Sequence, residues 1–320
     1  MVLFKLFLFA GLACALLLCL ASHHALPQTE ALSPAALGAT AARTFALSPA
    51  PTAAPTVAPT AAPTVAPTAA PTVAPTIGNH EEDLEVLRAA VETSLAVLRE
   101  IRARAFTPGC HAPDCWWQAS AGAAISAVQE ACRAYALSRY GPEPYLAQMD
   151  VSFPESMGGG DASLVFELAP LELVPYSVYF FLEKVLASNQ GGKFSRNAPH
   201  VLQASLHGAG ETLLFQEYDA RWPHKARTLG YAGRPGGSGA VYISTIDNTR
   251  NHGPDRKGES DVGFGRLLEA STVVVEKMTR QPGAQKMGFI TDAAHHIKIT
   301  AIRCLAPAER DAVLRDGQSR

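Results

Sequence analysis

Short apolar runs separated by turns rich in glycine and proline fill the chain from Tyr145 to Cys304. Many of their residues are β-branched or aromatic, and such residues favour strands. Two other segments, LVPYSVYFFLEKVLAS and ASTVVVEKMTRQPG, have helical spacing instead. Many short strands with only two helices predict a closed β-barrel or a β-sandwich with helical caps. The expected strands lie in YLAQMDVSF, ASLVFELAP, HVLQASLH, TLLFQEYD, ARTLGYAG, GAVYISTID, VGFGRLLEA and HHIKITAIRC.

The N-terminus carries one lysine and then an uncharged apolar run, Leu6 to Ala21. The run is intermediate in length between a signal-peptide core and a membrane-spanning helix. We therefore expect residues 1–22 to be a signal peptide or a signal anchor that directs the chain to the secretory pathway. If this segment is an anchor, Lys5 favours a cytoplasmic N-terminus and a luminal barrel, in the ER or Golgi. If the segment is a cleaved signal peptide, the protein would be secreted.

A proline-threonine repeat, PTAAPTVA, occurs three times between Pro51 and Thr76. Proline at this density removes backbone donors and favours extended, polyproline-like conformations. The side chains are too small to bury a core, so we expect residues 23–78 to form a disordered, semi-rigid stalk. Its threonines are candidate O-glycosylation sites.

Residues 79–141 have helical spacing. The first segment begins with acidic residues and ends with arginines, as the helix dipole favours. Its apolar seam predicts either a short coiled coil, giving a homo-oligomer through residues 81–105, or an amphipathic helix packing on its own domain. A second helix should end at Gly141 and Pro142. The seam consists of Leu84, Leu87, Val91, Leu98 and Ile101, with Ser94 interrupting.

Four cysteines lie beyond the N-terminal apolar run: Cys110, Cys115, Cys132 and Cys304. An even number in an oxidising compartment favours disulfides. We predict a Cys110–Cys115 disulfide, with Cys132 and Cys304 either paired or free. A zinc site using His111 or Asp114 is the alternative, but its spacing fits no standard ligand pattern.

Charge and motifs exclude several function classes. The net charge of −2 provides no basic face for nucleic acid. The glycine-rich stretches MGGGD and GRPGGSG do not match a phosphate-binding fingerprint. His295 and His296 are neighbours at the start of an expected strand, so their side chains should point to opposite faces and not share a metal. We expect neither a metal nor another cofactor.

Five blocks in the second half of the chain resemble, in the same order, the cyclophilin family of peptidyl-prolyl isomerases. The resemblance covers about half of the chain. It implies a mainly β domain at residues 145–305, an eight-stranded antiparallel barrel capped by two helices, that folds without the stalk and is followed by a tail at 306–320. The blocks are LVFELAPLELVPYSVYFFLEKV, FSRNAPHVLQA, TLGYAGRPGGSGAVYIST, VGFGRLLEASTVVVEKM and IKITAIRC.

The resemblance also implies a site for proline-containing peptide or protein segments. Isomerisation of a prolyl bond faces a barrier of roughly 18–20 kcal/mol, because amide resonance must be broken. A cation near the prolyl nitrogen and an apolar slot for the ring would lower it. Arg196, which matches the catalytic arginine of the family, keeps its charge at neutral pH. The implied substrate-binding residues are Val201, Leu202, Gln203, Ala232, Gly233, Tyr242 and Asp261.

Many residues of the expected slot differ from those that the family has. The segment between Pro199 and Gln203 is one residue short, so Val201 and Leu202 stand where the family has an aromatic residue and a methionine. A loop tryptophan is missing from DNTRNHGPDRKGES. Further replacements are Gly233 for an asparagine, Ala240 for a glutamine, Tyr242 for a phenylalanine and Asp261 for a histidine.

Two functions are therefore expected as alternatives. The first is a weak peptidyl-prolyl isomerase of the secretory pathway. The second is a catalytically inactive module that binds peptide or glycan on a membrane stalk. The layout of stalk and anchor is similar to that of luminal Golgi enzymes, but no glycosyltransferase motif is present.

Overall fold

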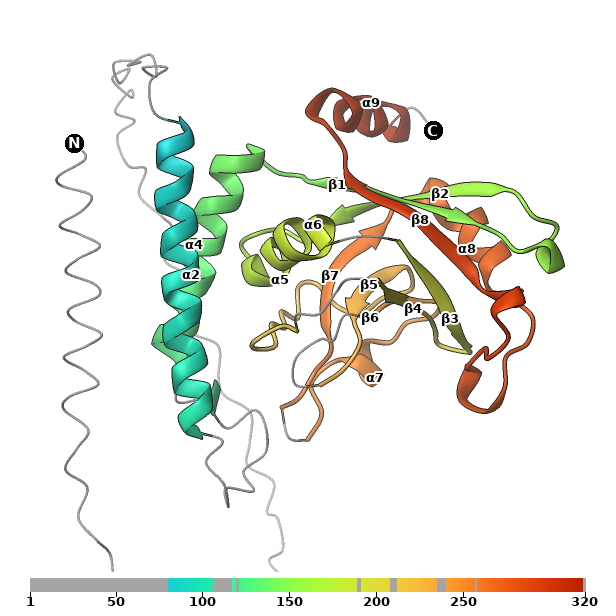
Figure 1. The fold of residues 1–320 in the computed structure, drawn as a ribbon, viewed down its shortest axis with the longest axis horizontal. Coiled ribbons are helices and arrows are strands. Elements are labelled where there is room, and N and C mark those ends of the chain that lie inside the picture. The colour runs from blue at the N-terminus through green and yellow to red at the C-terminus, as the bar shows by residue number, and fades with distance from the viewer. Residues whose placement is uncertain are drawn as a thin grey trace, which may run out of the picture. The chain divides into compact units, whose positions relative to one another are not determined.

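The computed structural model describes residues 80–105, 117–118, 121–188, 191–207, 212–234, 240–256 and 258–318 (Figure 1). They belong to one compact unit, Thr72–Arg320. The expected signal segment, the stalk, Cys110 and Cys115 lie outside the described residues. Within the described ranges, no helix is long and apolar enough to cross a bilayer.

Eight antiparallel strands close into a barrel in the order β1-β2-β7-β5-β6-β4-β3-β8 (Figure 1). The closed antiparallel barrel expected from the sequence is thus confirmed. Alternate residues of each strand fill its interior, where Phe264 stacks between Tyr231 and Phe181 with ring centroids 4.3 and 5.1 Å away. The strands are β1 (Leu146–Ser152), β2 (Asp161–Leu168), β3 (Gly192–Ala198), β4 (Val201–Leu206), β5 (Thr228–Tyr231), β6 (Ala240–Ser244), β7 (Val262–Leu267) and β8 (Ile297–Cys304).

One expected strand is wrong. The segment Thr212–Asp219 forms no strand, although its alternating apolar residues Leu213 and Phe215 are buried. These side chains pack beside a helix instead of completing the sheet, and Phe215 stacks on Tyr176 with centroids 4.6 Å apart. The hydroxyl of Tyr176 also accepts the backbone N–H of Leu214 at 3.1 Å. The eighth strand is β3, from the stretch that precedes Pro199.

The helices hold more of the described residues than the strands do, so "mainly β" applies to the barrel and not to the chain. α5 continues through a π-helical turn, Phe181–Val185, into α6, and α9 lies in the expected tail. The helices are α2 (His80–Ala105), α4 (Gly122–Tyr140), α5 (Pro175–Phe180), α6 (Leu186–Ser188), α7 (Thr249–His252), α8 (Thr272–Met278) and α9 (Pro307–Gln318).

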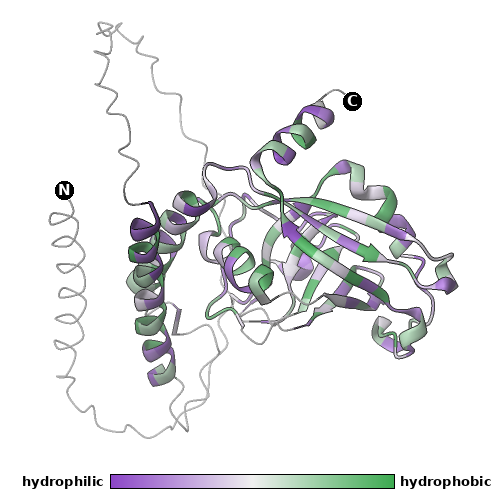
Figure 2. Cartoon of the chain, turned by 45° about the horizontal axis from the view of Figure 1, so that its top comes forward, coloured by the Kyte–Doolittle hydropathy of each residue, from purple (hydrophilic) through white to green (hydrophobic). Residues whose placement is uncertain are grey.

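The long helix α2 packs along α4, and α4 packs on α5 (Figure 1). Figure 2 shows apolar and hydrophilic residues alternating along α2, as an amphipathic helix requires. Its buried residues are Leu84, Val91, Leu95 and Leu98. Of the two alternatives for this helix, packing on its own domain is therefore the one observed within this chain.

Two of the cysteines can be placed. Cys132 is buried on α4, and Cys304 is half-buried at the end of β8. Both are free thiols, so the paired alternative for these two residues is wrong. Burial raises the pKa of both thiols, which keeps them protonated and unreactive at neutral pH.

Candidate functional site

A two-residue hairpin turn explains the proline in the stretch KFSRNAPHVLQAS. β3 ends at Ala198, β4 begins at Val201, and these two residues are paired across the strands. Pro199 and His200 form the turn between them. A proline has no N–H to contribute to a strand ladder, so the turn is where the fold tolerates it.

A β-bulge at Ser195 decides where Arg196 points. Phe194 pairs with Ala204 and Arg196 pairs with Gln203, so Ser195 is an extra residue in β3. Phe194 is part of the barrel core. In a regular strand the second residue along shares the same face, and Arg196 would then point into that core. The bulge reverses this alternation and places the guanidinium on the outer face.

Cross-strand pairs align the outer-face residues into a row. Arg196 pairs with Gln203, Gln203 pairs with Tyr242, and Tyr242 pairs with Gly230. Paired residues of neighbouring strands point to the same face. A Cβ on Gly230 would overlap the phenol ring of Tyr242, so this glycine lets the ring lie flat on β5. The row extends from a cation at β3 to an aromatic floor over β6 and β5.

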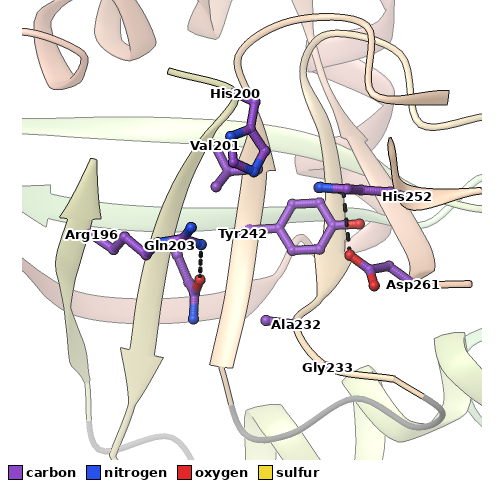
Figure 3. A pocket seen from close by; sticks show the side chains of 9 residues that line it. All are labelled: Arg196, His200, Val201, Gln203, Ala232, Gly233, Tyr242, His252 and Asp261. Atoms are coloured by element: carbon purple, nitrogen blue, oxygen red, sulfur yellow. Dashed lines mark hydrogen bonds and ion pairs between the residues drawn. The ribbon is translucent and has the colours of Figure 1, made fainter. Parts of the chain in front are cut away.

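A pocket of about 350 Å³ opens over this row (Figure 3). Arg196 and Gln203 lie on one side, His252 and Asp261 lie on the other, and Tyr242 lies between them. Seven of the eight residues expected from the sequence line this one pocket. The complete lining is Arg196, His200, Val201, Gln203, Ala232, Gly233, Tyr242, His252 and Asp261.

Leu202 is the expected residue that does not reach the pocket. It is fully buried and belongs to the barrel core. Its neighbours Val201 and Gln203 line the pocket, and successive residues of a strand point to opposite faces. Leu202 therefore supports the wall from behind.

Arg196 is held in place by three neighbours. Its Nη1 donates to Oε1 of Gln203 at 2.9 Å, and its Nε donates to the carbonyl oxygen of Met287 at 3.0 Å. Its Cζ lies 5.3 Å from the centre of the Phe289 ring, a cation–π distance. Among the described residues, none accepts a hydrogen bond from Nη2. The guanidinium is thus fixed in position and keeps donor capacity for a ligand.

The floor of the pocket is a hydrogen-bonded pair of rings. His224 is fully buried, and its Nε2 lies 3.2 Å from the carbonyl oxygen of Asp261. A carbonyl can only accept, so this nitrogen carries the proton. Nδ1 of His224 then accepts from the Tyr242 hydroxyl at 3.1 Å. Burial and the nearby His252 lower the pKa of His224 to about 4, so the ring is neutral at neutral pH.

The opposite wall is polar. Nε of Arg234 donates to Oδ1 of Asp261 at 2.7 Å, and Nδ1 of His252 lies 3.5 Å from Oδ2 of the same carboxylate. Burial, opposed by Arg234, raises the pKa of Asp261. Burial, followed by the charges of the neighbouring His200 and Arg234, lowers the pKa of His252 to about 4. The imidazole of His252 packs edge-on against Tyr242, with centroids 4.6 Å apart.

Two lining residues, His200 and His252, were missed from the sequence. His200 lies between Pro199 and Val201, where the expected motif is one residue short, so no role at the site was assigned to it from the sequence. His252 lies at the end of α7, in the segment from which the expected tryptophan is absent. Its ring packs against Tyr242, and a histidine in the segment where an aromatic residue was expected was the available signal.

This arrangement suits an uncharged, ring-sized group on Tyr242 beside a fixed cation. Pockets of this size that combine an aromatic floor with a few placed polar groups are typical ligand sites. Among the described residues, no group of three or more histidine, cysteine or acidic side chains could hold a metal ion.

No protein-family model matches the chain, and none of the curated proteins matches it.

Proposed function

We propose that this chain is a cyclophilin-type peptidyl-prolyl cis–trans isomerase of the secretory pathway, with weak activity. The observation that supports this most is the convergence of seven residues, chosen from sequence motifs, on one outer-face pocket of a closed barrel. In this proposal α5–α6 and α8 are the two capping helices. Residues 1–78 would tether or export the protein, and proline-containing segments of other proteins would be its substrates.

In the proposed mechanism, the pyrrolidine ring of the substrate lies on Tyr242 between Val201 and His252. Arg196 points a donor at the prolyl nitrogen. As the amide twists, the nitrogen lone pair loses its conjugation with the carbonyl and becomes localised on the nitrogen. A fixed cation stabilises this localised lone pair more than it stabilises the planar amide. Gln203 keeps the guanidinium in place through the 2.9 Å bond, so little reorganisation is needed when the bond twists.

A second candidate is binding without turnover. His200, His252 and Asp261 make the wall beside Tyr242 polar, and Val201 is smaller than an aromatic residue. Both features weaken the fit of an apolar ring and with it the positioning on which catalysis depends. A module of this kind would hold a peptide or glycan at the pocket.

Isomerisation of a panel of Xaa-Pro peptides, measured against the uncatalysed rate, tests the proposal. We expect the wild-type chain to accelerate some peptides and Arg196→Ala to lose about 10²-fold of that acceleration or more. Arg133→Ala, at an exposed position on α4, is the matched control and should act as wild type.

If wild type accelerates no peptide but binds one at the pocket, binding without turnover replaces the isomerase proposal. If wild type and Arg196→Ala accelerate equally, Arg196 is not the catalytic group.

A further inference from the structure

Two large apolar side chains are exposed beside Arg196. Met287 is 68% exposed and Phe289 is 47% exposed. Both touch the arginine, Met287 through its carbonyl oxygen and Phe289 through its ring. We refer to these two side chains as the Met287–Phe289 surface. Because Arg196 also lines the pocket, this surface continues the pocket past its cationic edge.

The segment that carries this surface is fixed to the barrel. The backbone N–H of Ile290 donates to the carbonyl of Ser195, the bulged residue, at 2.8 Å. Gly288 has a φ of +82°, and a Cβ there would collide with the backbone of Asn197 and Ala198. The apolar side chains are therefore displayed by a rigid turn and not by a loose loop.

Met287 itself has a φ of +64°. This left-handed region is uncommon for residues other than glycine, asparagine and aspartate, and such strain persists where the surroundings impose it. The turn thus holds a methionine in a costly conformation while leaving its side chain in solvent. That combination points to a contact with something outside the chain.

We propose that the Met287–Phe289 surface binds a large apolar side chain two residues away from the proline of the bound segment. This inference rests on the proposed function of the pocket. In an extended peptide, side chains on the same face are two residues and about 6.6 Å apart. The Phe289 ring centre lies 5.3 Å from Cζ of Arg196, the atom placed next to the prolyl nitrogen. The substrate class is therefore a proline segment with a flanking aromatic or large aliphatic residue.

The test uses the full-length chain and peptides with phenylalanine or serine placed two residues before or two residues after the proline. Binding and isomerisation are both measured. We expect wild type to favour phenylalanine about tenfold at one of these two positions, since burial of a large apolar side chain is favourable. Met287→Asn and Phe289→Ser should each reduce that preference to about twofold or less.

The Met287 variant separates the effect of the Met287 side chain from that of its backbone. Asparagine tolerates a positive φ and keeps the carbonyl that Arg196 binds, so Met287→Asn exchanges the apolar side chain for a small polar one and keeps the turn. Val273→Ser is the matched control, because Val273 is also 68% exposed but lies on α8. The control should keep the full preference.

Equal binding of phenylalanine and serine peptides by wild type would overturn the inference, as would a preference that survives in both variants. Self-association that is lost in Met287→Asn, without any peptide preference, would assign the surface to a second copy of the chain and overturn it too. A preference in binding without accelerated isomerisation would refute the isomerase but support this surface. Accelerated isomerisation without the preference would support the isomerase and refute the role of this surface.

Discussion

Arg196 reaches the pocket because a single extra residue, Ser195, interrupts β3. The residues around Arg196 identified it as a candidate, but they did not show on which face of the strand its side chain lies. A bulge hardly changes the pattern of apolar residues, so the sequence did not reveal it. Strand alternation alone would have placed Arg196 beside Phe194 in the core. Leu202 was misassigned because two consecutive strand residues were both expected in the slot, although strand geometry allows one of them there.

Gly230 is a residue where one methyl group should disrupt the pocket. Gly230→Ala would force the Tyr242 ring off β5 and break its bond to His224. We expect a loss of about 1–3 kcal/mol in unfolding free energy, the usual range for overpacking, together with loss of peptide binding. Urea titration and peptide titration measure the two effects.

Gly122→Ala is the control for that experiment. It lies at the start of α4, and an added Cβ would meet nothing within 4 Å. Stability should stay the same or rise by up to about 1 kcal/mol. Equal stability of the two alanine variants would contradict the role given to Gly230.

Histidine burial at the pocket should make the protein sensitive to acid. The pKa values of His224 and His252 are lowered to about 4 from 6.5, so the unfolded chain binds more protons between these values. The contribution of these two histidines to the unfolding free energy is therefore fully present above about pH 6.5. It falls as the pH drops toward 4, by at most about 1.4 kcal/mol per pH unit for each histidine. The raised pKa of Asp261 acts in the opposite direction.

Unfolding free energies at several pH values between 7.5 and 4.5 check this. His252→Gln should show a shallower decline than wild type over that range, because one titrating group is removed. Parallel curves for the two proteins would show that His252 is not the source of the acid sensitivity.

Among the elements, Glu217 connects three parts of the fold. It is buried and accepts the N–H and the hydroxyl of Ser177 at 2.7 and 2.6 Å, at the start of α5. It also accepts Nε2 of Gln129, on α4, at 2.9 Å. Burial raises the pKa of this carboxyl, and these donors oppose the shift.

Replacing Glu217 by leucine would leave those donors buried without an acceptor. We expect Glu217→Leu to lower the unfolding free energy by about 3 kcal/mol. Glu276→Leu, at an exposed position on α8, should change it by less than about 0.5 kcal/mol. Thermal and urea unfolding of both variants measure this, and a mild effect at Glu217 would mean that water replaces the carboxylate.

Glu217 also shows why one expected strand was wrong. Residues 212–219 carry the alternation of a strand, and alternate side chains are buried. Their partners are Tyr176, Ser177 and Gln129, which are 38 or more residues away in sequence. An alternating apolar pattern predicts that one side of a segment is buried, but it does not predict which element packs against that side. The other expected strands were confirmed because their runs pair within the barrel.

For the whole molecule, the helical pair and the barrel share one continuous core. Tyr135 of α4 packs edge-on against Tyr179 of α5, with centroids 5.6 Å apart. The Tyr140 hydroxyl donates to Glu183 at 2.7 Å, and Lys184 bonds Glu92 of α2 at 3.3 Å. The helices α2 and α4 thus cover the outer side of α5 and its continuation.

A fragment of residues 145–318 should therefore fold its barrel but be less stable than a fragment of residues 80–318. We expect its melting temperature to be lower by about 5 °C or more, because the apolar faces of α5 lose their cover. Calorimetry and binding of a hydrophobic dye measure this. Equal melting temperatures would show that α2 and α4 contribute nothing to the stability of the barrel.

Closure of the barrel also restricts how a partner can be recognised. Each of the eight strands has a neighbouring strand on both sides, and β4, β6 and β5 behind the pocket are hydrogen-bonded on both sides, so they offer no free edge to which a partner could add a strand. A segment bound over these three strands cannot extend their sheet through a ladder of main-chain hydrogen bonds. It must instead project a few side chains onto the outer wall, and an exposed bend in a folded protein can do that as well as an unfolded tail can.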